Sequence, residues 1–389
     1  DRVPAICRHF GVCGGCKWQH MDYQKQLYYK NKEVQDHLKR IGGITPEKVL
    51  PILGAPEQFY YRNKMEYSFS SQKWLTRAQI ESDQVIDNRN ALGFHIPGFW
   101  DKILDLKECH LQDAKGNEIR DFIKHKAQEL DLIFFDPRAQ TGHLRTLMLR
   151  NTTLGQWMVL IQFYEDPGPL RDILLRSVAE AFPEVNSLLY VINQKANDTL
   201  YDQDIEVYQG KDYIEEAMGN LRFRINAKSF YQTNSKQAIG LYDIVKEFAG
   251  LTGGQGVYDL YTGTGTIAQY LAAEAKWVVG IESVSDAIKA AKENAQRNHI
   301  ENAQFFVGDM KELFDKNFIA KHGKADVVIT DPPRDGMHKS VVDQLIALGA
   351  PRIVYVSCNS ATQARDLALM KEHYKVVKSR AVDMFPQTH

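Results

Sequence analysis

Five cysteines carry the clearest chemistry in this sequence. Cys7, Cys13 and Cys16 stand close together around Gly14-Gly15, in a segment that suits a loop wrapped around a metal centre. Cys109 is the candidate for a fourth thiol, although a free cysteine is also commonly a small buried apolar residue. The pattern therefore predicts a four-thiolate site made by Cys7, Cys13, Cys16 and Cys109.

The fifth cysteine, Cys358, is predicted to be a nucleophile. It lies in Val-Ser-Cys-Asn (356–359), at the end of an expected strand. Carbon 5 of uracil is too poor a nucleophile to accept a methyl group directly, whereas addition of a thiolate to carbon 6 makes carbon 5 enolate-like. A cysteine at this position therefore favours methylation of a pyrimidine carbon. The alternative is an inert cysteine at a strand end.

The elements that would position Cys358 follow a strand, turn, helix pattern from about residue 226 onward. Apolar runs predict strands at 255–260, 277–282, 305–309, 326–331 and 352–358, with a short helix after 266 and a longer one over 285–299. Strands that alternate with helices form a doubly wound, Rossmann-like parallel sheet of the α/β class. Ligands of such sheets bind at the carboxyl ends of the strands.

A glycine loop follows the first of these strands. Gly263-Thr-Gly265 allows close approach of the backbone to a ligand, and with Ala268 and Glu282 it also fits a dinucleotide fingerprint. A dinucleotide-dependent oxidoreductase is therefore one alternative. The acids that end successive strands favour S-adenosylmethionine instead, because a dehydrogenase has no use for an Asp-Pro-Pro motif; these acids are Asp259, Glu282, Asp309 and Asp331. Arg334, where an aromatic residue is usual, argues against methylation of an exocyclic amine.

The first half of the chain predicts a mainly β (α+β) domain. A helix over 22–41 starts at the N-cap candidate Asp22 and has Leu27, Val34, Leu38 and Ile41 on one face. Strands are predicted at 64–70, 91–96, 144–149, 157–164 and 187–192, and a helix at 170–181. We expect residues 1–225 to form the cluster and RNA-recognition region, residues 226–389 to form the methyltransferase domain, and the helix over 22–41 to pack on the latter.

Composition sets broad limits. The chain has 389 residues, 44% of them hydrophobic and 25% charged, which is enough for two or three ordinary domains. No apolar run approaches the ~18–20 residues that cross a bilayer, and no signal peptide is recognisable, so we expect a cytoplasmic monomer with reduced cysteines. The net charge of −1 neither favours nor excludes a nucleic-acid partner.

Four motifs resemble one family, the iron–sulfur-containing 23S rRNA (uracil-5-)-methyltransferases. They are Cys7-x5-Cys13-Gly-Gly-Cys16, Tyr61-Arg-Asn-Lys64, Ser357-Cys-Asn359 and Met384-Phe-Pro386, and they extend over almost the whole chain. The resemblance implies a [4Fe-4S] cluster on the four N-terminal-region cysteines, with a zinc site as the alternative. It also implies that S-adenosylmethionine is the methyl donor and that the substrate is a single-stranded or flipped-out uridine in 23S rRNA.

The same resemblance assigns roles to individual residues. Gln232 would lie between cofactor and base, Cys358 would attack carbon 6, and Arg62 and Lys64 would contact RNA phosphates. The cofactor would be bound by Tyr261, Gly263, Gly265 and Thr266 in the loop, by Glu282 at the ribose, by Asp309 at the adenine and by Asp331 at the methionine or the uracil. Three alternatives stay open: a tRNA uridine-5 methyltransferase, an oxidoreductase with an accessory metal cluster, and an RNA-binding protein with impaired catalysis.

Relatives in this family often have a small β-barrel ahead of the cysteines and a glutamate shortly after the Phe-Pro-x-Thr-x segment. From residues 1–389 alone, we expect RNA affinity to depend on the central sheet. We also expect the step that removes the carbon 5 proton to be slow, because Glu372 is the nearest upstream carboxylate in sequence and no pattern shows that it could act as the base.

Overall fold

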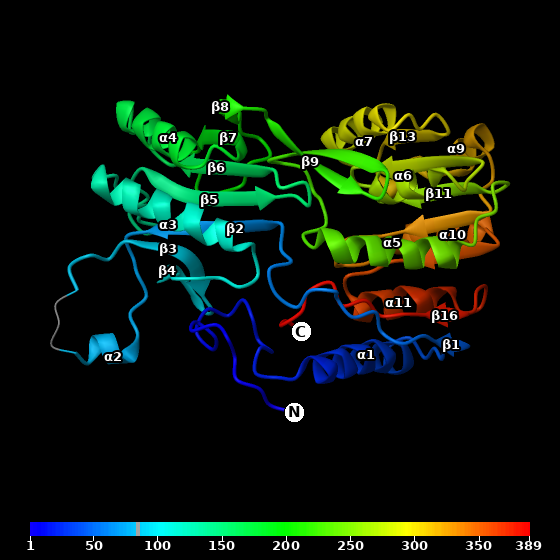
Figure 1. Ribbon diagram of the computed structural model, residues 1–389. Helices are drawn as coiled ribbons and strands as arrows, with labels where there is room; N and C mark the ends of the chain where they lie inside the picture. Colours follow the sequence, from blue (N-terminus) through cyan, green and yellow to red (C-terminus); the bar gives the residue numbers. More distant parts are fainter. Residues whose placement is uncertain (83–85) are drawn as a thin grey trace.

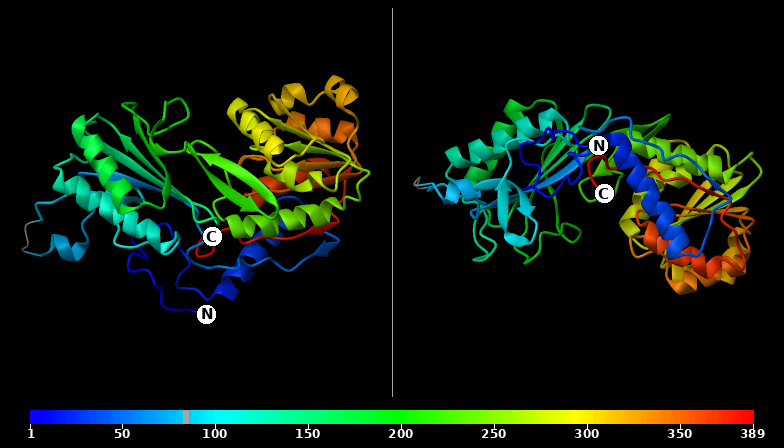
Figure 2. Two further views of the ribbon diagram at one scale, coloured as in Figure 1. Left: turned by 45° about the horizontal axis from the view of Figure 1, so that its top comes forward. Right: turned by 90° about the horizontal axis from the view of Figure 1, so that it is seen from below.

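The structure, a computed structural model, describes residues 1–82 and 86–389. Two lobes lie side by side, each built on a β-sheet, and both chain ends lie near the junction between them (Figures 1 and 2). Among the helices that the structure describes, none combines the length and the apolar composition that a membrane span requires.

The first lobe contains a seven-stranded mixed sheet in the order β4-β3-β2-β5-β6-β7-β8. Its pairings are antiparallel except for β6 with β7. The strands are β2 (Lys64–Ser70), β3 (Ala91–Ile96), β4 (Phe99–Asp105), β5 (Leu144–Asn151), β6 (Trp157–Phe163), β7 (Val185–Ile192) and β8 (Glu206–Gly210). All five strands predicted in this half are present.

Two helices cover one face of this sheet, α3 (Ala114–Glu129) and α4 (Pro169–Ala181) (Figure 1). The opposite face contributes to a second core, and β6 belongs to both: Val159 and Ile161 face the helices, while Met158 and Leu160 face the other way. A strand buried on both faces appears in the sequence as a continuous apolar run. Helix α3 was not predicted from the sequence.

Helix α1 (Tyr23–Arg40) begins as predicted, with the Asp22 carboxylate accepting from the backbone N–H of Gln24 at 3.0 Å. It lies along helix α11 of the second lobe, where His37 Nδ1 is 2.8 Å from Ser360 Oγ (Figure 2). Leu27 and Leu38 are buried, but Ile41 is exposed, because the helix ends at Arg40 and Ile41 is only its C-cap. Strand β1 (Lys48–Val49) pairs with β16 (Lys378–Ser379), and α2 spans Arg77–Ile80.

The second lobe is the predicted α/β unit. Five parallel strands have the order β13-β12-β11-β14-β15. They are β11 (Gly256–Leu260), β12 (Trp277–Glu282), β13 (Ala303–Val307), β14 (Val327–Thr330) and β15 (Arg352–Tyr355). Strands β13, β14 and β15 end earlier than predicted, so that Asp309, Asp331 and Cys358 lie in the segments that follow them.

Helices cover both faces of this parallel sheet. One face is packed by α5 (Ser235–Ala249), α6 (Thr266–Ala272) and α7 (Ser285–Arg297). The other is packed by α8 (Met310–Leu313), α9 (Lys316–His322), α10 (Lys339–Leu348) and the end of α11 (Ser360–Met370). The lobe is therefore doubly wound, and the carboxyl ends of its strands share one edge.

A hairpin of β9 (Tyr213–Met218) and β10 (Leu221–Asn226) bridges the two lobes (Figure 1). Its apolar residues Ile214, Met218, Phe223 and Ile225 belong to the same core as strands of the first sheet and helices of the second lobe. Asn294 Oδ1 of α7 accepts from the backbone N–H of Arg224 at 2.9 Å. The predicted division at 225/226 remains a prediction, because this core is continuous across it.

Candidate active site

The glycine loop after β11 turns sharply through left-handed backbone conformations. Tyr261, Gly263 and Gly265 have φ values of 62°, 56° and 75°. A Cβ at Gly265 would lie 2.8 Å from the Phe305 ring and 2.9 Å from Ala291 Cβ, so both space and backbone require glycine there. Tyr261 adopts its left-handed conformation without being glycine, a form of strain that is concentrated at functional sites.

Glu282 fixes the shape of this loop from the end of β12. One carboxylate oxygen accepts from Gly263 N at 3.2 Å, and the other accepts from Ser283 N at 2.8 Å and Val284 N at 3.1 Å. The carboxylate therefore stands at the edge of the sheet with its orientation set by three backbone donors.

Two acids lie beneath the loop, Asp259 fully buried and Asp331 half-buried. Asp259 Oδ2 accepts from Thr262 Oγ1 at 2.5 Å and Ala268 N at 3.0 Å, while Oδ1 has no hydrogen-bond partner within residues 1–82 and 86–389. Burial, and secondarily the neighbouring Asp331 carboxylate, raise the pKa of Asp259 to about 7. Burial also raises the pKa of Asp331 to about 6. A bound cation beside this pair would favour the ionised carboxylates.

Gln232 and Thr266 both lie beside Tyr242, which was not predicted from the sequence to belong to the site. Tyr242, on α5, is buried, and its side chain lies beside those of Thr266 and Gln232 and near Asp331. Burial raises the pKa of Tyr242, so its hydroxyl stays protonated and can donate. Within an amphipathic helix this tyrosine has the pattern of an ordinary core residue, and only the fold brings it to the site.

Cys358 lies exposed in the turn between β15 and α11. The next residue, Asn359, caps α11 and donates from Nδ2 to the backbone oxygen of Arg334 at 3.1 Å. Thr362 Oγ1 donates to the same oxygen at 3.0 Å. These bonds tie the Cys358 turn directly to the Asp331-Pro-Pro-Arg334 loop.

Asp309 lies at the same edge of the sheet but in a more exposed position. It caps α8, where Oδ1 accepts from Lys311 N at 2.9 Å, and it is exposed beyond the end of β13. The structure therefore places Tyr261, Gly263, Gly265, Thr266, Glu282, Asp309, Asp331 and Cys358 along one edge, with Gln232 reaching it from the loop before α5.

The four other cysteines also lie together. Cys7, Cys13, Cys16 and Cys109 line one cavity between the N-terminal loop and the turn after β4. Burial raises the pKa of all four thiols, to about 11 for Cys13 and about 12 for Cys16. Within residues 1–82 and 86–389, no group of three or more His, Cys, Asp or Glu side chains is placed to hold a metal ion, so the four-thiolate site remains a prediction.

The two predicted RNA contacts make intramolecular interactions. The Arg62 guanidinium lies over the Phe385 ring at 5.6 Å, and Arg62 Nε is buried with no hydrogen-bond partner among the described residues. Lys64 Nζ lies 2.6 Å from Glu66 Oε1. Arg62 is thus held near the junction of the lobes, whereas Lys64 sits in a partly exposed ion pair.

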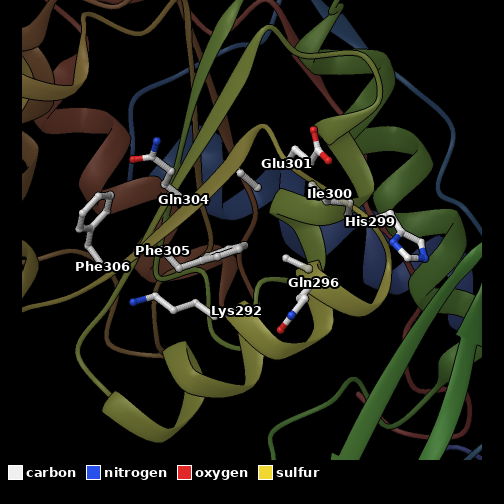
Figure 3. Close-up of a pocket in the computed structure, with 10 residues that line it drawn as sticks. Lys292, Gln296, His299, Ile300, Glu301, Gln304, Phe305 and Phe306 are labelled. Atoms are coloured by element: carbon white, nitrogen blue, oxygen red, sulfur yellow. The ribbon is translucent and has the colours of Figure 1, made fainter.

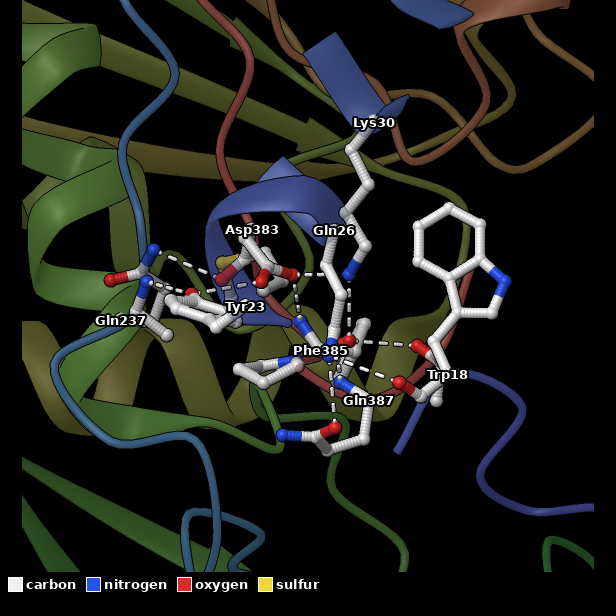
Figure 4. A network of polar contacts seen from close by, with 12 residues as sticks. Trp18, Tyr23, Gln26, Lys30, Gln237, Asp383, Phe385 and Gln387 are labelled. Carbon is white, nitrogen blue, oxygen red and sulfur yellow. Dashed lines mark hydrogen bonds and ion pairs between the residues drawn. The ribbon is translucent and has the colours of Figure 1, made fainter. Parts of the chain in front are cut away.

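A polar network ties the segment 383–387 to the rest of the protein (Figure 4). The buried Asp383 carboxylate accepts from Lys30 Nζ at 2.6 Å and from Tyr23 hydroxyl at 3.0 Å. Gln26 Nε2 donates to Gln387 Oε1 at 3.0 Å. The backbone oxygen of Gln387 accepts from the N–H groups of Lys17 and Trp18, so the network connects α1 with the cysteine loop.

A further cavity, of about 620 Å³, lies away from Cys358 between the end of α7 and the edge strand β13 (Figure 3). Lys292, Gln296 and His299 line it from α7 and the turn that follows. Phe305, which also backs the cofactor loop at Gly265, forms part of its wall.

Comparison with known proteins decides the family. A family model described as tRNA (uracil-5-)-methyltransferase matches residues 201–389. An uncharacterized RNA methyltransferase of Porphyromonas gingivalis is 53% identical over 100% of this chain and 85% of its own length, and one of Bacteroides thetaiotaomicron is 51% identical over 100% and 86%. The chain belongs to the RNA (uracil-5-)-methyltransferase family.

A solved structure agrees with this assignment. The Pyrococcus abyssi tRNA (uracil-54, C5)-methyltransferase in complex with S-adenosyl-L-homocysteine is 30% identical, with a TM-score of 0.76 over 97% of this chain and 84% of that one. The predicted methyltransferase fold, the S-adenosylmethionine cofactor and an RNA substrate are therefore confirmed at the level of the family. The oxidoreductase alternative was wrong, because the fingerprint at Gly263–Ala268 belongs to a methyltransferase loop.

Proposed function

We propose that this protein transfers a methyl group from S-adenosylmethionine to carbon 5 of a uridine in RNA, through a covalent bond between Cys358 and carbon 6. The observation that carries the proposal is the exposed Cys358 thiol at the sheet edge that also carries the glycine loop, called here the cofactor edge. Its turn is tied to the Asp331 loop through Arg334. A uracil bound there would meet the nucleophile and the cofactor loop from one side of the sheet.

The proposed reaction proceeds by addition, methyl transfer and elimination. The Cys358 thiolate adds to carbon 6, and carbon 5 takes the methyl group from the sulfonium, which leaves S-adenosylhomocysteine. Removal of the carbon 5 proton then expels the thiolate and restores the double bond between carbons 5 and 6. A base for that proton is required, and no described side chain is assigned to the role.

The residues gathered at the edge have the chemistry that the cofactor needs. Glu282 would accept from the ribose hydroxyls, and Asp309 would lie on the adenine side. Asp331 would place its half-buried carboxylate near the positive sulfonium, and Gln232, which stands beside Tyr242, would lie between the cofactor and the base. Tyr261, Gly263, Gly265 and Thr266 form the loop that closes around the cofactor.

We further propose that Cys7, Cys13, Cys16 and Cys109 hold a [4Fe-4S] cluster. The shared cavity supports this, since four thiolates are the usual ligands. A four-cysteine zinc site has the same ligand count and is the alternative. The cluster would fasten the N-terminal loop to the turn after β4 and would stabilise the RNA-facing lobe.

The proposed target is a uridine of 23S rRNA, as the four-cysteine resemblance implies. A tRNA target is the second candidate, because the Pyrococcus abyssi structure is that of a tRNA (uracil-54, C5)-methyltransferase. In either case the uridine must be single-stranded or flipped out, because carbons 5 and 6 are inaccessible within a stack.

One experiment separates the two targets. 5-Methyluridine is mapped in 23S rRNA and in tRNA from cells with and without the gene. Loss of a single 5-methyluridine from 23S rRNA supports the proposal; loss from tRNA alone identifies the second candidate, and loss from neither contradicts both.

A separate measurement tests the proposed [4Fe-4S] cluster. Protein purified without oxygen is expected to contain iron and sulfide in near-equal amounts, and to be brown. Zinc in place of iron would contradict the cluster while leaving the methylation proposal unaffected.

A further inference from the structure

Asn63 joins the first sheet to the loop that carries Gln232. It lies immediately before β2, at the junction of the lobes. Its backbone N–H donates to the Thr233 oxygen at 2.8 Å, and its backbone oxygen accepts from Asn151 N at the end of β5, at 3.0 Å. The residue is therefore fixed on one side by the sheet and on the other by the loop at 232–235.

The side chain of Asn63 uses both of its amide hydrogens on that loop. Nδ2 donates to the backbone oxygen of Gln232 at 2.9 Å and to Ser235 Oγ at 2.7 Å. An amide nitrogen has two hydrogens, so its donor capacity is fully used by two atoms of one short segment. The bond to the Gln232 carbonyl holds the peptide from which the Gln232 side chain extends.

A buried carboxylate fixes the direction of these bonds. Ser235 Oγ donates to Glu216 Oε2 at 2.6 Å, so the serine oxygen turns its lone pairs toward Asn63. Glu216 is fully buried and also accepts from Thr153 N at 3.0 Å, Ala217 N at 2.9 Å and the Thr153 hydroxyl. A buried carboxylate with this many donors is a rigid anchor for the chain of bonds that ends at Gln232.

We propose that Asn63 is a positioning residue for methyl transfer, acting through the Gln232 carbonyl and the Ser235 hydroxyl to place the Gln232 side chain beside Tyr242 and Thr266. This inference rests on the function proposed above, in which Gln232 lies between cofactor and base. Asn63 itself touches neither, because its amide is directed at the loop backbone and at Ser235.

Asn63 also separates the two basic residues assigned to RNA. Arg62 and Lys64 are its chain neighbours, so RNA held by either of them lies one residue from the bond that fixes Gln232. The geometry couples the position of the RNA-facing strand to that of the loop at 232–235 through the Asn63 side chain and through its backbone bond to Thr233.

The test measures covalent capture of RNA that carries 5-fluorouridine. Fluorine cannot leave carbon 5 as a proton does, so the methylated Cys358 adduct persists and its formation can be timed without turnover. The rate is measured at saturating S-adenosylmethionine and RNA for the unaltered protein, for N63A and for N63D, which keeps the side-chain shape but removes both donors. Thermal unfolding midpoints are recorded for each variant.

N193A is the matched control. Asn193 is a fully buried asparagine, whereas Asn63 is half-buried, and the Asn193 Nδ2 donates to the Thr199 backbone oxygen at 3.1 Å, away from the loop at 232–235. We expect N63A and N63D to slow capture roughly 10- to 100-fold, the loss that a small misplacement of a catalytic group produces. N193A should lower the thermal midpoint to a similar degree and leave the capture rate unchanged.

Three outcomes would contradict the positioning role of Asn63 or the function on which it rests. If the unaltered protein forms no adduct, the proposed function fails, and with it the inference. If the unaltered protein forms the adduct and N63D forms it equally fast, the positioning role is overturned. If both Asn63 variants and N193A lose rate in proportion to their loss of thermal midpoint, Asn63 has only a structural role and the inference is wrong.

Discussion

The two groups of cysteines in this protein differ in exposure and in surroundings. Cys358 is exposed in a turn at the cofactor edge, whereas Cys7, Cys13, Cys16 and Cys109 line a cavity whose burial raises their pKa values. A thiol must be accessible and ionised to attack a base, while a buried thiol stays inert unless a metal displaces its proton. The exposed thiol is therefore suited to nucleophilic attack, and the four other thiols are suited to metal binding.

The largest expected effect tests the exposed thiol. Cys358→Ala should reduce methyl transfer and covalent capture to background, because the thiolate is the group that makes carbon 5 reactive. Incorporation of a labelled methyl group into RNA measures the loss. Cofactor binding, measured by calorimetry with S-adenosylhomocysteine, should remain. Residual methylation by the alanine variant would show that a different nucleophile operates.

A change in the four-cysteine group should affect stability and metal content more than methyl transfer. Cys13→Ser is expected to lose most of the bound iron and to lower the free energy of unfolding by several kcal/mol, because metal binding in such sites is coupled to folding. Iron analysis and thermal unfolding measure both. Capture of fluorouridine RNA should fall only as far as RNA binding falls. A variant that keeps its iron and its stability but loses the methyl-transfer step would contradict a structural role for these cysteines.

The Asp383 network ties the last segment of the chain to α1, and its removal should have the next largest effect. Asp383→Ala removes the carboxylate partner of the largely buried Lys30 ammonium, leaves it the Phe385 backbone oxygen alone, and should cost up to about 3–5 kcal/mol of unfolding free energy, the penalty for a buried charge that loses its counter-charge. Denaturant unfolding provides the value. Glu47→Ala, which breaks the exposed pair with Lys375, is the control and should change stability by less than about 1 kcal/mol. Equal effects would mean that Lys30 is not buried in solution.

The smallest effect concerns pH at the cofactor edge. Asp331, whose pKa burial raises to about 6, is largely protonated below that pH and ionised above it. The sulfonium of S-adenosylmethionine favours the ionised form, so its affinity should increase as pH rises from 5 to 7, by up to roughly tenfold. S-adenosylhomocysteine lacks this charge and should show a weaker dependence. Asp331→Asn should remove the difference; a difference that persists would assign it to another group, such as Asp259.

The cofactor edge was largely predictable from the sequence, since its features are local. A strand, a glycine turn and a helix follow one another along the chain, and acids recur where successive strands end, so the parallel sheet brings Glu282, Asp331 and Cys358 to one side. The ends of the strands were predicted less accurately than their positions in the sequence. Strand β15 stops at Tyr355, because Ser357 and Asn359 bond to the turn and to the cap of α11.

The junction between the lobes could not be predicted in the same way. Tyr242 looks like a core residue of α5, and Asn63 looks like one polar residue in a basic motif, until the fold brings both to Gln232. Asp383 and Lys30 are far apart in the chain and pair only when the last segment lies across α1. Contacts of this kind depend on tertiary packing, and no periodicity in the sequence records them.

The central claim is that Cys358 bonds to carbon 6 of a uridine in RNA. The most direct measurement incubates the protein with S-adenosylmethionine and RNA that contains 5-fluorouridine, digests the band that survives denaturant, and locates the modified peptide by mass spectrometry. The account predicts one nucleotide, carrying an added methyl group, on the peptide that contains Cys358, and no adduct with Cys358→Ala. An adduct on Cys7, Cys13, Cys16 or Cys109, or methylated RNA produced without any adduct, would contradict it.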